Sequence, residues 1–423
     1  MNKNATPEAW IPSLYFAEGL PYVLVMTVSV ILYKNLGVSN ADIAFFTSWL
    51  YLPWVIKPLW SPIVDLLGTK RSWIIAMQYL LGASLSAVAL LLPTEGFFRW
   101  TLLLFWLMAF SSATHDIAAD GYYMLALSEK NQSVFVGIRS VFYRIAMIAG
   151  QGGLVFVAGW LVEDRGMEQA QAWQRVMIFT SILFLFIGIY HTWILPRVET
   201  SGTVAGSTER KSVTDLLSSF FTKKNLLLAL LFILLYRLGE AQLAKIASPF
   251  LLDAREAGGL GLSTTQVGVI YGTVGVIALV TGGILGGLLA ARYGLKKCLW
   301  WMIGAMNLPN LVYVWMAFAQ PDNFFLITSC IAVEQFGYGF GFTAFMLYLM
   351  YFSQGKYKTS HYALCTGFMA LGMMIPGMFS GRIQEAVGYS SFFIWVCLCT
   401  LPGMVIAAFL KIDPEYGRKQ TLS

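Results

Sequence analysis

Ionisable residues inside apolar segments are the residues of this sequence that could do chemistry. The stretch SSATHDIAADGYY holds Asp116 and Asp120, which are four residues apart and share one face of a helix. The stretch GIRSVFYRIAMIAGQGG holds Arg139 and Arg144, and Lys57 lies in another apolar segment. A charge in hydrocarbon is costly unless it is paired, hydrated or protonated. We therefore predict one network of these five charges, acting either as static salt bridges or as a gate whose pairs break and re-form.

Glu18 lies in the stretch YFAEGLPY, beside Gly19 and shortly before Pro21. Glycine allows a neighbouring helix to approach closely, and proline can bend the helix. At its expected depth, Glu18 could meet Lys57 or the arginine pair. We weigh three roles for this carboxylate: a switchable member of the charge network, a coupling site that lines a cavity, and a static salt bridge.

A second group of intramembrane charges occurs late in the chain. Arg237 and Glu240 are three residues apart in YRLGEAQLAKIASP, so they can pair on one helix face, and Lys245 follows farther along. Glu334 lies within IAVEQFGYGFGF. We predict that Arg237, Glu240 and Glu334 line a cavity, where Arg237 could bind an anionic group of a solute.

The elements that must hold these charges are long apolar helices. Hydrophobic residues make up 57% of the 423 residues and charged residues only 12%, against roughly 25% in a soluble protein. Stretches of about 20 apolar residues, each long enough to cross a bilayer, recur along the chain. We predict twelve membrane helices, over residues 10–33, 42–63, 73–92, 99–122, 137–160, 174–195, 225–251, 265–289, 298–319, 324–350, 360–384 and 392–410.

Several other functional classes are disfavoured. The net charge of +6 comes from scattered basic residues, which does not fit a nucleic-acid-binding protein. The five cysteines form no CxxC pair, and the three histidines are far apart, so we predict neither a metal nor a cofactor. His115 and Asp120 form an H-x4-D pattern found in some acyltransferases, but they lie in an apolar segment with no adjoining catalytic domain.

The distribution of basic residues predicts the orientation. With the amino terminus inside, 17 basic residues fall on the inner side and 5 on the outer side. We expect both termini to be cytoplasmic, with the first helix as an uncleaved signal anchor.

The chain divides into two similar halves. We predict a six-helix bundle over 1–197, a cytoplasmic linker with an interfacial helix over 198–224, and a six-helix bundle with a cytoplasmic tail over 225–423. An offset of 226 residues aligns Gly68 with Gly294, and the basic residues that follow each glycine also align.

This organisation resembles the major facilitator superfamily, in which two halves rock about a midplane site. The loop SPIVDLLGTKR looks like the superfamily's signature between its second and third helices, at Asp65, Gly68, Lys70 and Arg71. The resemblance implies an all-α polytopic membrane protein. In physical terms the loop can act as a gate, because Gly68 permits a tight turn and Asp65 can pair with a cation on a neighbouring helix when the inside is closed. The alternative, which is compatible with a gate, is that the basic residues Lys70 and Arg71 only enforce the topology.

A closer resemblance is carried by five stretches of the first half of the chain. The stretches are FAEGLP (16–21), KPLWSPIVD (57–65), KRSWIIAMQ (70–78), SSATHDIAADGY (111–122) and VGIRSVFYRIAMIAGQGG (136–153). Together they resemble AmpG-like muropeptide permeases and the related acetyl-CoA transporters. The resemblance implies proton-driven import of a GlcNAc–anhydro-MurNAc compound across a bacterial inner membrane. It carries the family's paired acids onto Asp116 and Asp120, its arginine onto Arg144 and its lysine onto Lys57.

We therefore predict a secondary transporter, not an enzyme, that imports muropeptides or related amino sugars with protons by alternating access. Its partners would be a small solute, protons and the bilayer, and it would function as a monomer. The alternatives are another cargo such as acetyl-CoA, a siderophore or a drug; a polytopic acyltransferase; and a receptor without net flux.

Overall fold

The computed structural model describes residues 6–198, 218–355 and 358–417, and in these residues all regular elements are helices. The all-α prediction is thus confirmed. Most of the predicted linker, residues 199–217, lies outside the described residues.

The chain forms two compact units, and each contains a segment from the opposite side of the predicted linker. The first unit comprises Met1–Val38, Ile56–Thr208 and Ser263–Gly272. The second unit comprises Ser39–Val55, Glu209–Leu262 and Thr273–Ser423.

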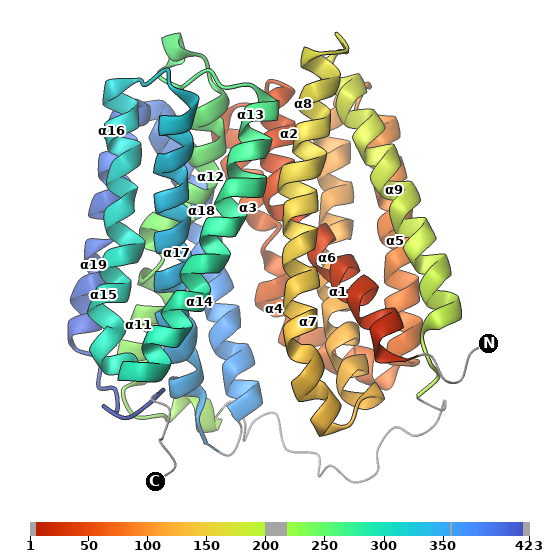
Figure 1. Cartoon of the computed structure of the whole chain (residues 1–423), viewed down its shortest axis with the longest axis vertical. Helices are drawn as coiled ribbons and strands as arrows, with labels where there is room; N and C mark the ends of the chain where they lie inside the picture. Colours follow the sequence, from red (N-terminus) through yellow and green to blue (C-terminus); the bar gives the residue numbers. More distant parts are fainter. Residues whose placement is uncertain (1–5, 199–217, 356–357, 418–423) are drawn as a thin grey trace. The chain divides into compact units, whose positions relative to one another are not determined.

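In the first unit, α1 packs against α6 and α7, while α5 packs between α6 and α9 (Figure 1). The long helix α6 therefore contacts both α1 and α5. The helices are α1 (Pro7–Val23), η1 (Leu24–Val28), α2 (Ser29–Asn35), most of α4 (Leu52–Leu66), α5 (Lys70–Leu91), α6 (Phe97–Ala126), α7 (Glu129–Met147), η2 (Ile148–Leu154), α8 (Val155–Glu163), α9 (Gln169–Ile194) and α13 (Thr264–Val269).

In the second unit, α18 packs against α3 and α12, and α17 packs against α14 and α15 (Figure 1). The short helix η4 (Ile270–Gly275) is divided between the units: its residues up to Gly272 belong to the first unit and those from Thr273 belong to the second. The other helices are α3 (Asn40–Trp49), α11 (Leu226–Leu235), α12 (Leu238–Leu252), η3 (Arg255–Ala257), α14 (Val276–Tyr293), α15 (Leu295–Asn307), η5 (Leu308–Asn310), α16 (Leu311–Ala319), α17 (Phe324–Ser353), α18 (Lys358–Leu398) and α19 (Leu401–Ala408).

Helices occupy all twelve predicted membrane ranges, but several of these ranges are divided between two or more helices. Among the described residues, nine helices are individually long and apolar enough to span a bilayer. The range 42–63 is divided at Leu50–Tyr51 into α3 and α4. The last two ranges are joined through α18, which is interrupted at Gly388, where φ is +74°.

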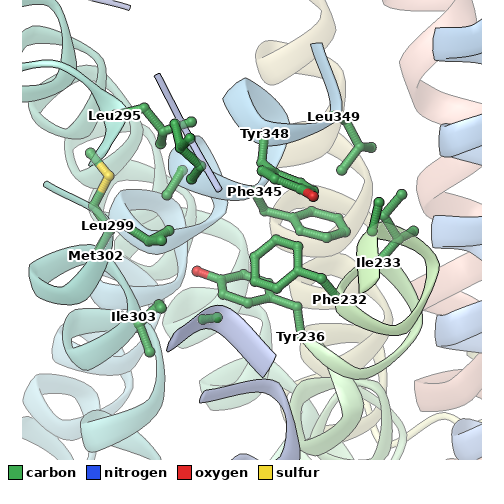
Figure 2. Close-up of a cluster of buried hydrophobic side chains, with 14 of the residues drawn as sticks. Phe232, Ile233, Tyr236, Leu295, Leu299, Met302, Ile303, Phe345, Tyr348 and Leu349 are labelled. Carbon is green, nitrogen blue, oxygen red and sulfur yellow. The ribbon is translucent and has the colours of Figure 1, made fainter. Parts of the chain in front are cut away.

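Aromatic packing holds the second unit together at a break between α11 and α12 (Figure 2). Tyr236 stacks on Phe345 with ring centroids 5.0 Å apart and an interplanar angle of 4°. Phe232 packs edge-on against Tyr348 at 4.7 Å. These buried rings hold Tyr236, the residue that follows α11, in place. They therefore also fix the backbone position of Arg237, which comes next in the chain.

The loops after the second span of each half share a backbone feature. Gly68 has a φ of +79° and Gly294 a φ of +84°. Only glycine adopts positive φ at little cost, so both loops need this residue for the turn. The match, at the offset of 226 residues, supports the repeat inferred from the sequence.

Candidate functional site

The first unit contains a cluster of five charged residues drawn from four helices, hereafter the charge cluster. Glu18 comes from α1, Lys57 from α4, Asp116 and Asp120 from α6, and Arg139 from α7. The two aspartates are one helical turn apart, which directs both toward the same neighbours.

Two ion pairs organise the charge cluster. Lys57 pairs with Asp116, and Arg139 Nη2 lies 2.7 Å from Asp120 Oδ1. The Arg139 guanidinium also lies over the ring of Tyr15, 4.5 Å from the centroid, and 5.7 Å from that of Tyr123. Cation–π contacts of this kind add to the attraction that the carboxylate exerts on the guanidinium.

Glu18 is the third acid of the charge cluster, and none of the cations whose side chains the structure describes forms an ion pair with it. Its side chain is 6% exposed, and its Oε2 has no hydrogen-bond partner among the described residues. Carboxylate oxygens of Glu18, Asp116 and Asp120 lie within 4.8 Å of one another. Three acids and two bases leave one surplus negative charge. That spacing could also hold a metal ion, but Lys57 and Arg139 already neutralise the two aspartates.

A cavity of about 360 Å³ opens beside Glu18 and Arg139. Ser140, Tyr143, Arg144 and Met147 of the α7–η2 segment complete its lining. The charge cluster is therefore accessible from a polar cavity large enough for several water molecules or part of a solute.

Arg144 departs from the expected network. No carboxylate among the described side chains pairs with it, although it lines the same cavity as Glu18. Five residues of α-helix turn the chain by about 140°, so Arg144 leaves α7 in a different direction from Arg139, which pairs with Asp120, although both side chains line the cavity.

The local sequence around Glu18 explains how the carboxylate reaches this position. A Cβ on Gly19 would lie 2.9 Å from Tyr143 O and 3.0 Å from Ala146 Cβ, so only glycine allows α1 and α7 to approach this closely. Pro21 lies three residues before the start of the π-helical turn η1 at Leu24. Such turns break the regular hydrogen-bond ladder and often occur at functional sites.

The predicted gating loop contains residues with identifiable structural partners. Arg71 donates from Nε to Leu195 O at 2.9 Å and from Nη2 to Thr192 O, so it binds the carbonyl end of α9. Lys70 is buried with its stem against Gly121 of α6. Gly68 forms the turn, and the side chain of Asp65 lies outside the described residues.

The second unit contains the predicted Arg237–Glu240 pair. Arg237 Nε and Nη2 donate to the two oxygens of Glu240 at 2.7 and 2.6 Å, and Nη2 also donates to Tyr338 OH at 2.8 Å. The guanidinium lies 4.9 Å from the centroid of the Phe342 ring. Because Arg237 occupies the break between α11 and α12, this pair sits where the helix is discontinuous, a feature of transporter binding sites.

Glu334 of α17 is buried, being 5% exposed. Its Oε2 accepts hydrogen bonds from Gln335 Nε2 at 2.9 Å and Tyr313 OH at 3.5 Å. Among the described side chains no cation pairs with it. Glu334 is thus a buried acid held by neutral donors.

A chain of hydrogen-bonded polar side chains next to the charge cluster was not predicted from the sequence. Gln78 of α5 lies 2.9 Å from both His115 Nε2 and His191 Nδ1, and His191 Nε2 lies 2.8 Å from Ser13 Oγ. The two histidines are therefore close in space although 76 positions apart, and they hold four helices together. In the sequence, each of these four residues is only a polar residue within a different apolar segment, and nothing in the sequence indicates that they contact one another.

Comparisons with known proteins agree with this architecture. A sequence profile of the Major Facilitator Superfamily matches residues 13–375. The chain is 29% identical over 413 residues to the anhydromuropeptide permease of Escherichia coli strain K12, covering 96% of this chain and 80% of that protein. The resemblance to AmpG-like permeases is thus confirmed.

Two solved structures share the fold over nearly their full length. A D-xylose-proton symporter has a TM-score of 0.71 at 11% identity, covering 98% of this chain and 99% of that one. A bacterial homologue of the human lysosomal transporter Spinster has a TM-score of 0.70 at 14% identity, covering 96% and 97%. The family profile and the similarity to the E. coli permease indicate a transporter and not a polytopic acyltransferase. The chain is therefore a multi-pass membrane protein that belongs to the major facilitator superfamily of transporters.

Proposed function

We propose that this transporter imports anhydromuropeptides or related amino sugars together with protons, by alternating access. It would act as a monomer in a bacterial inner membrane with both termini in the cytoplasm. The cargo is supported by the similarity to the E. coli anhydromuropeptide permease, and the orientation by the excess of basic residues on the inner side.

The observation that carries the coupling mechanism is the charge imbalance of the charge cluster. One proton would neutralise the surplus charge of Glu18, Asp116 and Asp120 against Lys57 and Arg139. A neutral cluster tolerates an apolar environment, whereas an unbalanced one favours hydration through the adjoining cavity. Loading and release of one proton at Glu18 would therefore bias which ion pairs form, and so bias the conformation.

The solute-binding role belongs to the second unit in this proposal. Arg237, Glu240 and Glu334 offer the charged donor and acceptors that sugar hydroxyls and amides require, and Tyr338 adds a hydroxyl and an aromatic face. A discontinuous helix beside them provides backbone groups as well.

Gating is assigned to the loop between the second and third spans and to the cavity wall. Asp65, Gly68, Lys70 and Arg71 would act at the inner end, and Arg144 would meet solute or water in the cavity. The bonds from Arg71 to the end of α9 support a role in holding this end of the first unit as one body.

The test is direct uptake by the purified protein in proteoliposomes. GlcNAc–anhydro-MurNAc should enter faster, and accumulate, when the pH outside is lower than inside. Uptake indifferent to the pH gradient would refute proton coupling. Absence of uptake would refute the cargo.

A second cargo is tested in the same vesicles. Acetyl-CoA, a siderophore or a drug-like cation in excess should not inhibit uptake of the labelled disaccharide. Full competition by one of them would redirect the assignment to that cargo.

A further inference from the structure

Lys245 is a buried cation that the proposed mechanism does not use. It lies on α12, is 3% exposed, and donates from Nζ to Thr47 Oγ1 of α3 at 2.9 Å. Its Nζ lies 5.3 Å from the centroid of the Tyr51 ring. No carboxylate among the described side chains pairs with it.

This environment is unusual for an intramembrane ammonium group. Arg237, on the same helix segment, is neutralised by Glu240, whereas the polar and aromatic contacts of Lys245 Nζ within the described part of the chain are a hydroxyl oxygen and a ring. Both are weak partners compared with a carboxylate. A buried charge without a counterion marks a functional position, whose missing partner must be found.

The surroundings of Lys245 include one further hydrogen-bond donor, the hydroxyl of Ser48. Ser48 of α3 is fully buried, and its Oγ has no hydrogen-bond partner among the described residues. A Cβ on Gly377 of α18 would lie 2.8 Å from Ser48 Oγ and 3.5 Å from Lys245 Cγ. The ammonium stem and the unused hydroxyl therefore flank one residue that has no side chain.

We propose that Lys245 of α12 and Ser48 of α3 face each other across a binding site for a carboxylate group of the solute, which is closed in the present conformation and opens when α3 shifts away from α12. The Thr47 hydroxyl then occupies the place of a carboxylate oxygen. Lys245 lies seven residues before the end of α12 at Leu252, which is about 10 Å along the helix axis. Movement of α3 would therefore expose Lys245 near the Leu252 end of α12. The inference rests on the proposed function, because anhydro-N-acetylmuramic acid carries a lactyl carboxylate.

The test compares two solutes that differ only at that carboxylate. Proteoliposome uptake is measured for GlcNAc–anhydro-MurNAc as the free acid and as the lactyl amide. Lys245→Met should raise the KM for the acid by about 30-fold or more, because one partner of a charge pair is lost. The KM for the amide should change by less than about twofold, and Lys245→Arg should retain most of the affinity for the acid.

A second pair of variants tests the covering role of α3. Thr47→Val removes the hydroxyl that competes with the solute, so the KM for the acid should fall severalfold. Thr180→Val is the matched control. Both threonines are buried and bond the carbonyl four residues back, at 2.6 Å to Ile43 O and 2.7 Å to Val176 O. Only Thr47 contacts a lysine.

The outcomes separate this inference from the proposed function. If the unaltered protein transports both solutes and Lys245→Met weakens them equally, or weakens neither, the carboxylate site is wrong and the cargo assignment stands. If the unaltered protein transports neither, both proposals fall. Size-exclusion profiles and Tm values identify variants that do not fold, and for these the Lys245→Arg and Thr47→Val results decide.

Discussion

Replacing Glu18 by Gln should abolish proton-driven accumulation of solute while leaving solute exchange intact. The substitution keeps the size and shape of the buried Glu18 side chain, which lines the cavity beside α7. It removes the surplus negative charge, so the two remaining acids balance Lys57 and Arg139 at all times. The altered charge cluster no longer needs a proton to be neutral.

The expected magnitude follows from the charge count. One surplus charge implies one proton per cycle, and a pH difference of one unit supplies about 1.4 kcal/mol per proton. At zero membrane potential the unaltered protein should therefore concentrate solute about tenfold. Glu18→Gln should reach an inside-to-outside ratio of about 1 under the same gradient.

The assay uses proteoliposomes with the membrane potential clamped to zero by potassium and valinomycin. Accumulation of labelled disaccharide is measured with the external pH one unit below the internal pH. Exchange of internal for external label, which requires no net proton movement, is measured at equal pH. Glu256→Gln is the control, because Glu256 is exposed on the short helix η3.

Two results would refute the reasoning. Tenfold accumulation by Glu18→Gln would show that the surplus charge is not the coupling site. Loss of both accumulation and exchange, with the variant still folded, would show that Glu18 contacts the solute or holds the helices together instead.

Three further outcomes concern stability, measured as Tm in detergent. Lys57→Gln should destabilise the protein by roughly 1–3 kcal/mol, between surface and buried values, because the Lys57 and Asp116 side chains are 28% and 22% exposed. The double variant Lys57→Gln/Asp116→Asn should recover much of the lost stability, because it returns the charge cluster to its original net charge. A double variant whose Tm is no higher than that of Lys57→Gln alone would contradict this. Gly19→Val should cost roughly 1–3 kcal/mol, because its Cβ lies 2.9 Å from a backbone oxygen on α7; Gly153→Val, with nothing within 4 Å, is the control. Gly68→Ala should cost roughly 1–2 kcal/mol because φ is +79°, and a neutral effect would mean that the turn can change its conformation.

Hydropathy was sufficient to locate the helices, because a bilayer requires long apolar segments whatever their tertiary contacts. It could not find the break at Leu50–Tyr51, where the sequence remains apolar throughout. Nor could it show that α3 packs on α18, because membrane helices associate through small-residue surfaces that hydropathy does not report.

Sequence spacing predicted the contacts that lie within one helix and missed several between helices. The Arg237–Glu240 pair follows from a separation of three residues, and it is present. Arg144 was assigned to the network from its depth alone, which ignores the direction of its side chain around α7. Lys245 remained unassigned because its contacts come from a helix about 200 residues earlier in the chain.

The π-helical turns also bear on how the length of this chain can change during evolution. A π turn contains one residue more than the α-helical turn it replaces, and η1, η2 and η4 each place such a turn inside a longer helix. Deleting one residue from such a π turn would restore a regular α-helix, and the helical segments before and after it would keep the same faces toward their neighbours. These three turns are therefore where homologous helices should differ by a single residue, and where alignments of this family need a gap inside a membrane span.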